Sequence, residues 1–280
     1  MTDATDTIDA EITANGLQFH YREWGDPNAP PVLILHGITG HSWEWDTVAR
    51  ALSSDFHVIA LDQRGHGASD WTDSYAPEAM ADDIGAVLAE LGIGRVKLVG
   101  HSMGAINSYL FAGRNPRAVE RLVIADVSPD SLTEDAEEML RTALSAWAAA
   151  SFTTPDDAFA EWRENSPLAT DHGLRLYVNH NLTRRGDGRF VWRFDAARLS
   201  GFIDALPPAE EQWQAIRNVD CPVLVLRGGE SDLFSHEAAG RLSQRLLYAT
   251  LAEIPHAGHD IHIDRPDLTI QAIRGFLTGA

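Results

Sequence analysis

The segment Gly100-His101-Ser102-Met103-Gly104 constrains the fold of this chain more than any other feature. It follows the apolar run 96–99 and precedes the helical stretch 105–113, so Gly-x-Ser-x-Gly stands between a strand and a helix. Such a turn holds its serine in a strained conformation, and side chains at positions 100 and 104 would collide with neighbouring backbone. It would also expose the hydroxyl at a helix N-terminus, whose dipole favours developing negative charge. The pattern therefore predicts that Ser102 is a nucleophile.

Length and charge exclude several classes of partner. The 280 residues suffice for one large core with an insertion. A net charge of -19 argues against nucleic acid and anionic membranes, since both require a basic face. No window approaches the ~20 apolar residues of a membrane span. The acidic segment 1–6 does not resemble a signal peptide, and the single Cys221 permits no internal disulfide, so we expect a cytoplasmic protein.

Short apolar runs alternate with helical patterns at both ends of the chain, which predicts an α/β fold with a mostly parallel sheet. Residues 8–13 and 17–23 read as a hairpin around Asn15-Gly16. The further expected strands are 31–36, 57–61, 95–99, 122–125, 223–226 and 250–254. The expected helices include 42–52, 80–91, 238–247 and 268–277.

The rhythm changes between these two parts. Strand-like runs give way to acidic, alanine-rich helical segments with many aromatic residues. We interpret 1–128 and 208–280 as the two parts of a core domain and 129–207 as an inserted, mainly helical cap. The aromatic residues could form the core of the cap or contact a partly apolar substrate. Its arginines could hold a substrate carboxylate, but pairing with Asp187 and Asp195 is the preferred interpretation.

A serine nucleophile requires a base and an acid that orients it, and in open parallel sheets such groups follow the carboxyl ends of strands. The acid candidates are Asp126, Glu230 and Asp232. Asp232 is preferred, because the glycines after strand 223–226 could turn its carboxylate back toward the sheet. Asp126, which ends the preceding strand, is the alternative.

The base is expected in the loop after the last strand, where His259 follows a glycine. His256, His259 and His262 are spaced by three, which raises the question of a metal. The loop lacks the His-Glu-x-x-His helix and paired cysteines of zinc sites, so we expect neither metal nor cofactor. The order Ser102, Asp232, His259 is that of serine, acid and histidine in one lineage of serine triads.

A tetrahedral oxyanion needs two fixed donors, and losing one costs about 10²–10³-fold in rate. One donor is expected to be the backbone N–H of Met103, directly after the nucleophile. The other is expected from the segment His36-Gly37-Ile38-Thr39-Gly40, through the N–H of Ile38.

With these segments, the chain resembles the α/β-hydrolase superfamily over nearly all of its length. The resemblance rests on His36-Gly37, 62–67, 100–104, 229–232 and Ala257-Gly258-His259. It implies an eight-stranded sheet with an antiparallel second strand, flanked by helices, and a variable cap after the sixth strand. Epoxide hydrolases and haloalkane dehalogenases of this fold carry Asp where this chain has Ser102. The oxyanion segment lacks the extended Gly-Gly of many lipases.

The expected function is hydrolysis of small or medium, partly apolar carboxylic esters or lactones through an acyl-enzyme. Two alternatives stay open, because some proteins of this fold are cofactor-free oxygenases of aromatic heterocycles and others are ligand receptors with slow hydrolysis. The sequence decides neither the physiological substrate nor the oligomeric state.

Overall fold

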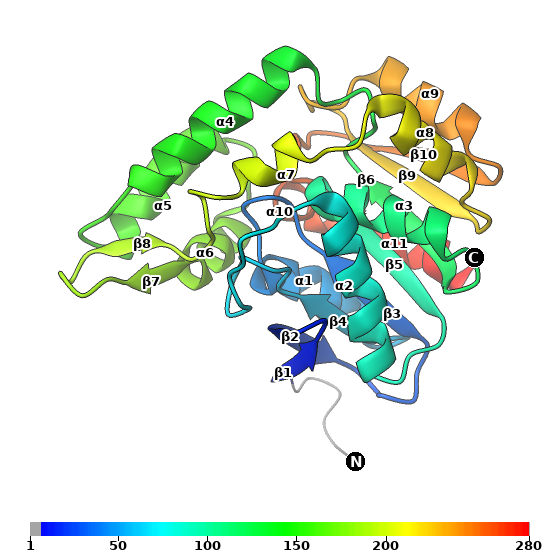
Figure 1. Ribbon diagram of the computed structural model, residues 1–280, viewed down its shortest axis with the longest axis horizontal. Coiled ribbons are helices and arrows are strands. Elements are labelled where there is room, and N and C mark those ends of the chain that lie inside the picture. Colours follow the sequence, from blue (N-terminus) through cyan, green and yellow to red (C-terminus); the bar gives the residue numbers. More distant parts are fainter. Residues whose placement is uncertain (1–6, 280) are drawn as a thin grey trace.

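The computed structural model of the protein describes residues 7–279, so the acidic segment 1–6 lies outside the described part. Within it, eight strands form one sheet in the order β1-β2-β4-β3-β5-β6-β9-β10 (Figure 1). The strands are β1 (Ile8–Ala14), β2 (Leu17–Trp24), β3 (Pro31–Leu35), β4 (His57–Leu61), β5 (Val96–His101), β6 (Val119–Ala125), β9 (Val223–Gly228) and β10 (Ala249–Ile254).

The strand directions agree with the expected fold. β2 runs antiparallel to both β1 and β4, and every other neighbouring pair is parallel. The β1–β2 turn uses Asn15 at φ 50° and Gly16 at φ 76°, the left-handed conformations that a two-residue hairpin turn requires.

Helices cover both faces of the sheet because its parallel strands are apolar on both sides. Leu33 and Leu35 of β3 belong to one buried cluster, and Val32 and Ile34 belong to a second. The first cluster includes side chains of α2 (Pro77–Glu90), α3 (Met103–Arg114), α8 (Ala209–Arg217) and α9 (His236–Arg245). The second includes α1 (Asp46–Leu52), α10 (Ile261–Asp264) and α11 (Pro266–Thr278).

The segment between β6 and α8 carries most of the remaining elements, which lie to the left and top of Figure 1. They are α4 (Glu134–Ala149), α5 (Pro155–Asn165), α6 (Asp171–His180), β7 (Leu182–Arg184), β8 (Phe190–Trp192) and α7 (Ser200–Asp204). The short β7–β8 pair is the part that helical periodicity does not anticipate. The division into core and cap domains stays a prediction.

The aromatic side chains of this segment pack mainly on one another. Trp162 contacts Trp147, Tyr177 and Trp192 with ring centroids 5.3, 5.0 and 4.9 Å apart. Trp162, Tyr177 and Trp192 are all buried, and they belong to the same buried cluster as the side chains on one face of the sheet. These rings therefore serve in packing, and the core that they join is continuous with the core on that face of the sheet.

Two arginines of this segment pair as expected from the sequence. Arg185 Nη2 lies 2.5 Å from Asp187, and Arg198 Nη1 lies 3.2 Å from the buried Asp195.

In residues 7–279, no helix combines the length and apolar character needed to cross a bilayer.

Candidate active site

Ser102 occupies the sharp turn between β5 and α3. Its backbone has φ 51° and ψ -120°, a combination that L-residues rarely adopt. The Ser102 N–H donates to the carbonyl of Ala125 at 3.0 Å, which fixes the turn to the end of β6. The strain expected at this serine is therefore present.

The two glycines of the motif allow β5, α3 and β3 to approach one another. A Cβ atom at Gly100 would lie 2.5 Å from both the Gly104 carbonyl oxygen and Ser108 Oγ. A Cβ atom at Gly104 would overlap the Leu35 carbonyl oxygen at the end of β3. These contacts account for glycine at both positions.

His259 lies in the loop between β10 and α10. Its Nδ1 is 2.8 Å from Asp126 Oδ2, and its side chain is 31% exposed. A carboxylate only accepts hydrogen bonds, so Nδ1–H donates, and in the neutral ring Nε2 carries the lone pair. Burial lowers the pKa of His259, but the hydrogen bond and charge of Asp126, together with the charges of Asp260 and Asp264, outweigh burial and raise it overall. The ring is therefore oriented to accept a proton at Nε2.

The acid that contacts His259 is Asp126, the alternative candidate, and not Asp232, the preferred one. Asp126 follows β6 at φ 56°, and its side chain is fully buried. It accepts hydrogen bonds from Gly228 N at 2.7 Å and from Ser231 Oγ at 2.5 Å. Asp232 is exposed.

The physical reason is how the turn after β9 packs. A Cβ atom at Gly228 would overlap the Gly258 carbonyl oxygen, so this turn lies directly against the His259 loop. Gly228 N and Ser231 Oγ fill the space there and hold the carboxylate of the neighbouring strand. The strand also runs to Gly228, two residues beyond the expected end, which shortens the turn. The signal for Asp126 was its place directly after the strand next to β5.

Glu230, the third acid candidate, contacts a different histidine. Its Oε1 lies 3.2 Å from His256 Nδ1, and both residues are exposed. Of the three loop histidines, His259 alone contacts Asp126, while His262 is buried in α10.

The two expected oxyanion donors lie at segments that adjoin the nucleophile. Gly37, before Ile38, is so close that a Cβ atom there would lie 3.4 Å from Ser102 Cβ. The Ile38 carbonyl is held by His66 Nε2 at 2.7 Å, which fixes the Ile38–Thr39 peptide. Met103 is the first residue of α3. Within residues 7–279, neither the Ile38 nor the Met103 N–H has a hydrogen-bond partner.

A buried polar network supports the loop that carries Ile38. The Gln63 N–H donates to His36 Nε2 at 2.9 Å, and the Gln63 side-chain amide donates to the His36 carbonyl at 2.8 Å. Because His36 Nε2 accepts, its ring is neutral, in agreement with burial that lowers its pKa well below the usual value. His36 and His66 therefore have structural roles.

A further contact ties the nucleophile segment to the base. His101, the residue before Ser102, lies with its Nε2 2.9 Å from the His259 carbonyl oxygen. No hydrogen bond joins the Ser102 hydroxyl to His259 within the described residues, and such contacts often tighten only when substrate binds.

Comparison with known proteins identifies the family of this chain. A family model described as the alpha/beta hydrolase fold matches residues 30–266. The 2-(acetamidomethylene)succinate hydrolase of Mesorhizobium japonicum is 31% identical, over 96% of this chain and 95% of its own. A crystal structure of E-2-(acetamidomethylene)succinate hydrolase matches with a TM-score of 0.90 and 28% identity, covering 98% of this chain and 100% of that one.

A second relative is an esterase of Mycobacterium tuberculosis, Rv0045c, which is 30% identical over 91% of this chain and 84% of its own. Its solved structure, reported together with transition-metal inhibition of that enzyme, has a TM-score of 0.82 at 26% identity and covers 97% of this chain and 92% of that one. These relatives are hydrolases, and the family model spans most of the sequence. The chain therefore belongs to the α/β-hydrolase family.

Proposed function

We propose that this hydrolase cleaves carboxylic esters or lactones of small to medium size through a triad of Ser102, His259 and Asp126. The observation that carries the proposal is the 2.8 Å contact between His259 Nδ1 and Asp126, which leaves the Nε2 lone pair available as a base. The strained turn at Ser102, tied to β6 beside Asp126, supports the assignment of the nucleophile. Relatives that are named as an esterase and a hydrolase support the reaction class.

In the proposed reaction, His259 removes the Ser102 proton as the hydroxyl oxygen attacks the substrate carbonyl carbon. Asp126 stabilises the imidazolium that forms, and the N–H groups of Ile38 and Met103 donate to the oxyanion. Collapse expels the alcohol, which takes its proton from His259, and leaves an acyl group on Ser102. Water, deprotonated by His259, then attacks the acyl carbon. The bond to Ser102 Oγ breaks, His259 returns the proton to this oxygen, and the carboxylic acid is released.

The proposal is tested by turnover and by covalent labelling. Rates on p-nitrophenyl esters of increasing chain length, with lactones and thioesters alongside, define the substrate class. A fluorophosphonate should add one mass increment at Ser102, and Ser102→Ala should lose labelling and about 10⁴–10⁶-fold in kcat. Ser42→Ala is the matched control, because Ser42 lies in the half-motif Gly40-His41-Ser42 and its buried hydroxyl has no partner in the described chain.

The alternatives give different results. Oxygen uptake on an aromatic heterocycle without ester turnover would indicate an oxygenase. A ligand that raises Tm without measurable turnover would indicate a receptor. An unlabelled Ser102 in folded protein would contradict the proposed mechanism.

A further inference from the structure

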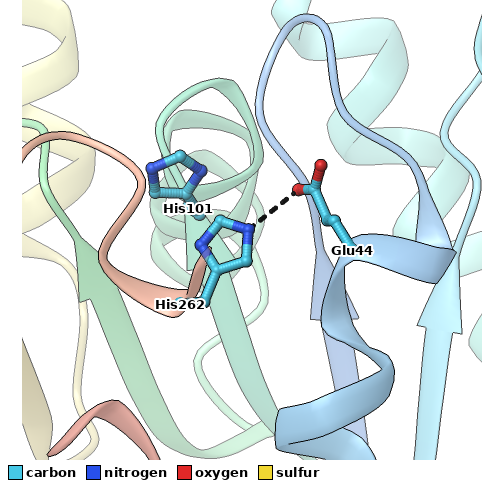
Figure 2. A group of neighbouring side chains, drawn as sticks. All are labelled: Glu44, His101 and His262. Atoms are coloured by element: carbon cyan, nitrogen blue, oxygen red, sulfur yellow. Dashed lines mark ion pairs between the residues drawn. The ribbon is translucent and has the colours of Figure 1, made fainter. Parts of the chain in front are cut away.

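Three buried side chains from distant segments meet in the interior, and one of them, His101, directly precedes Ser102 in the chain (Figure 2). Glu44 comes from the 3₁₀ helix η1 (Ser42–Trp45), His101 from the end of β5 and His262 from α10. Their exposed fractions are only 5%, 2% and 2%. One carboxylate oxygen and one nitrogen from each ring all lie within 4.8 Å of one another.

The hydrogen bonding of His101 leaves a free lone pair in this cluster. Its Nε2 lies 2.9 Å from the His259 carbonyl oxygen, which can only accept, so Nε2 carries the proton. Burial lowers the pKa of His101 to about 3, so Nδ1 is unprotonated. This buried Nδ1 has no hydrogen-bond partner among residues 7–279. Histidines that bind metals typically donate their other ring N–H to a carbonyl or carboxylate in this way.

His262 and Glu44 complete the set of possible ligands. The His262 ring stacks on Trp45 with centroids 4.1 Å apart and planes within 1°, which fixes its orientation. Neither ring nitrogen of His262 makes a hydrogen bond within the described part of the chain, although Nε2 lies 3.2 Å from Glu44 Oε1. The loop backbone encloses the carboxylate, since a Cβ atom at Gly40 would lie 2.6 Å from both of its oxygens.

Two imidazole nitrogens and one carboxylate oxygen are ligands that Zn²⁺ and similar transition metals prefer. Bond lengths of about 2.0–2.1 Å place tetrahedral ligand atoms about 3.3 Å apart, so these atoms, which lie within 4.8 Å of one another, would have to close by up to about 1.5 Å. The unpartnered buried nitrogens are costly to keep from water, and burial raises the pKa of the Glu44 carboxyl well above its usual value because it disfavours the charged form. A cation would satisfy all three groups at once.

A neighbouring group fits a metal less well. His101, His259 and Asp260 also bring ligand atoms within 4.8 Å. There, however, His259 Nδ1 already contacts Asp126, and His101 Nε2 already contacts a carbonyl. The free lone pair of His101 belongs to the first cluster.

We propose that Glu44, His101 and His262 form a buried site for one transition-metal ion of the Zn²⁺ class, and that occupation of this site inhibits the enzyme. The inhibition rests on the proposed function. His259 must become positively charged during the reaction, and its ring centroid lies 4.6 Å from that of His101. A dication on His101, only partly neutralised by Glu44, opposes that charge.

Metal binding is measured separately from activity. Equilibrium dialysis of the full chain against Zn²⁺ should retain one ion per chain, and Co²⁺ should give the visible absorption of a low-coordinate site. Crystals soaked in Zn²⁺ should show an anomalous peak between the three side chains. A peak at His259 and Asp260, or at the surface only, would overturn the proposed location.

Variants connect the site to inhibition. Glu44→Gln keeps the shape of the side chain and removes the anionic ligand, so both the Zn²⁺ dissociation constant and the inhibition midpoint should rise at least tenfold. His262→Gln is the second variant if Glu44→Gln does not fold. His256→Gln is the matched control, because it removes an exposed histidine paired with a glutamate on the same loop. It should bind and be inhibited like the wild type.

Each outcome separates the hypotheses. Unchanged binding in Glu44→Gln and His262→Gln would refute the site. Loss of binding in His256→Gln would assign the metal to the surface. Binding without inhibition would keep the site and refute its effect on activity. Metal binding in a protein without ester turnover would keep the site and refute the proposed function.

Discussion

Replacement of Asp126 by asparagine tests the assignment that the structure changed. The carboxylate accepts from Gly228 N, Ser231 Oγ and His259 Nδ1. In the Asp126→Asn variant the side-chain carbonyl oxygen can still accept from Gly228 N, so the amide NH₂ takes the place of Oδ2. That NH₂ can donate to the Ser231 hydroxyl, but it also faces His259 Nδ1. The histidine must then accept at Nδ1 and carry its proton at Nε2.

The expected loss follows from this tautomer. With Nε2 protonated, His259 cannot take the Ser102 proton, and in serine triads the same exchange lowers kcat by about 10⁴-fold. At about 1.4 kcal/mol per tenfold change, this is about 5.5 kcal/mol of transition-state stabilisation. Asp232→Asn, at an exposed position, should change kcat less than about twofold.

The assay is the initial rate of p-nitrophenyl ester hydrolysis by both variants, with circular dichroism and Tm as checks of folding. Because the substitution at Asp126 is isosteric and keeps the Gly228 contact, KM should change far less than kcat. A large loss in Asp232→Asn together with near-normal rates in Asp126→Asn would refute the reasoning and restore the acid expected from the sequence.

Two predictions concern stability. Gly104→Ala should destabilise the fold by about 1–3 kcal/mol, because its methyl group would overlap the Leu35 carbonyl. The control Gly94→Ala has open space around it and should change the stability little. Equal Tm values for the two variants would contradict this prediction. The second concerns the buried Asp62, where burial raises the pKa of the carboxyl, but a 2.8 Å contact to His20 and further hydrogen bonds lower it overall. Burial lowers the pKa of His20, but Asp62 and a second aspartate raise it overall. The lowered pKa of Asp62 stabilises the folded state above pH 3.8, the ordinary pKa of the group, and the raised pKa of His20 stabilises it below pH 6.5. Both contributions are therefore present near pH 5. In urea unfolding, Asp62→Asn should lower the free energy of unfolding most near pH 5 and less above pH 8. A cost that grows toward alkaline pH would contradict this sign.

Residues that act through local geometry were predictable from the sequence. The strained turn at Ser102 was predictable because such a strand-to-helix turn demands glycine on both sides, and Gly100 and Gly104 leave no room for a Cβ atom. The hairpin at Asn15-Gly16 was found for a similar reason, since two consecutive left-handed residues identify its turn.

The acid was not predictable because two strand ends offered carboxylates at suitable distances along the chain. The choice depended on the length of β9 and on the packing of its turn against Gly258. Neither quantity has a local signature. The same holds for the grouping of Glu44, His101 and His262, which lie on three separate elements.

The sequence by itself determined the elements, the strained serine and the loop that carries His259, because periodicity and steric exclusion act between near neighbours in the chain. The tertiary structure alone decided which carboxylate holds the imidazole and which buried groups gather behind the nucleophile. These pairings depend on sheet order and on close packing between segments far apart in the chain, as for Asp126 and His259, which are 133 positions apart.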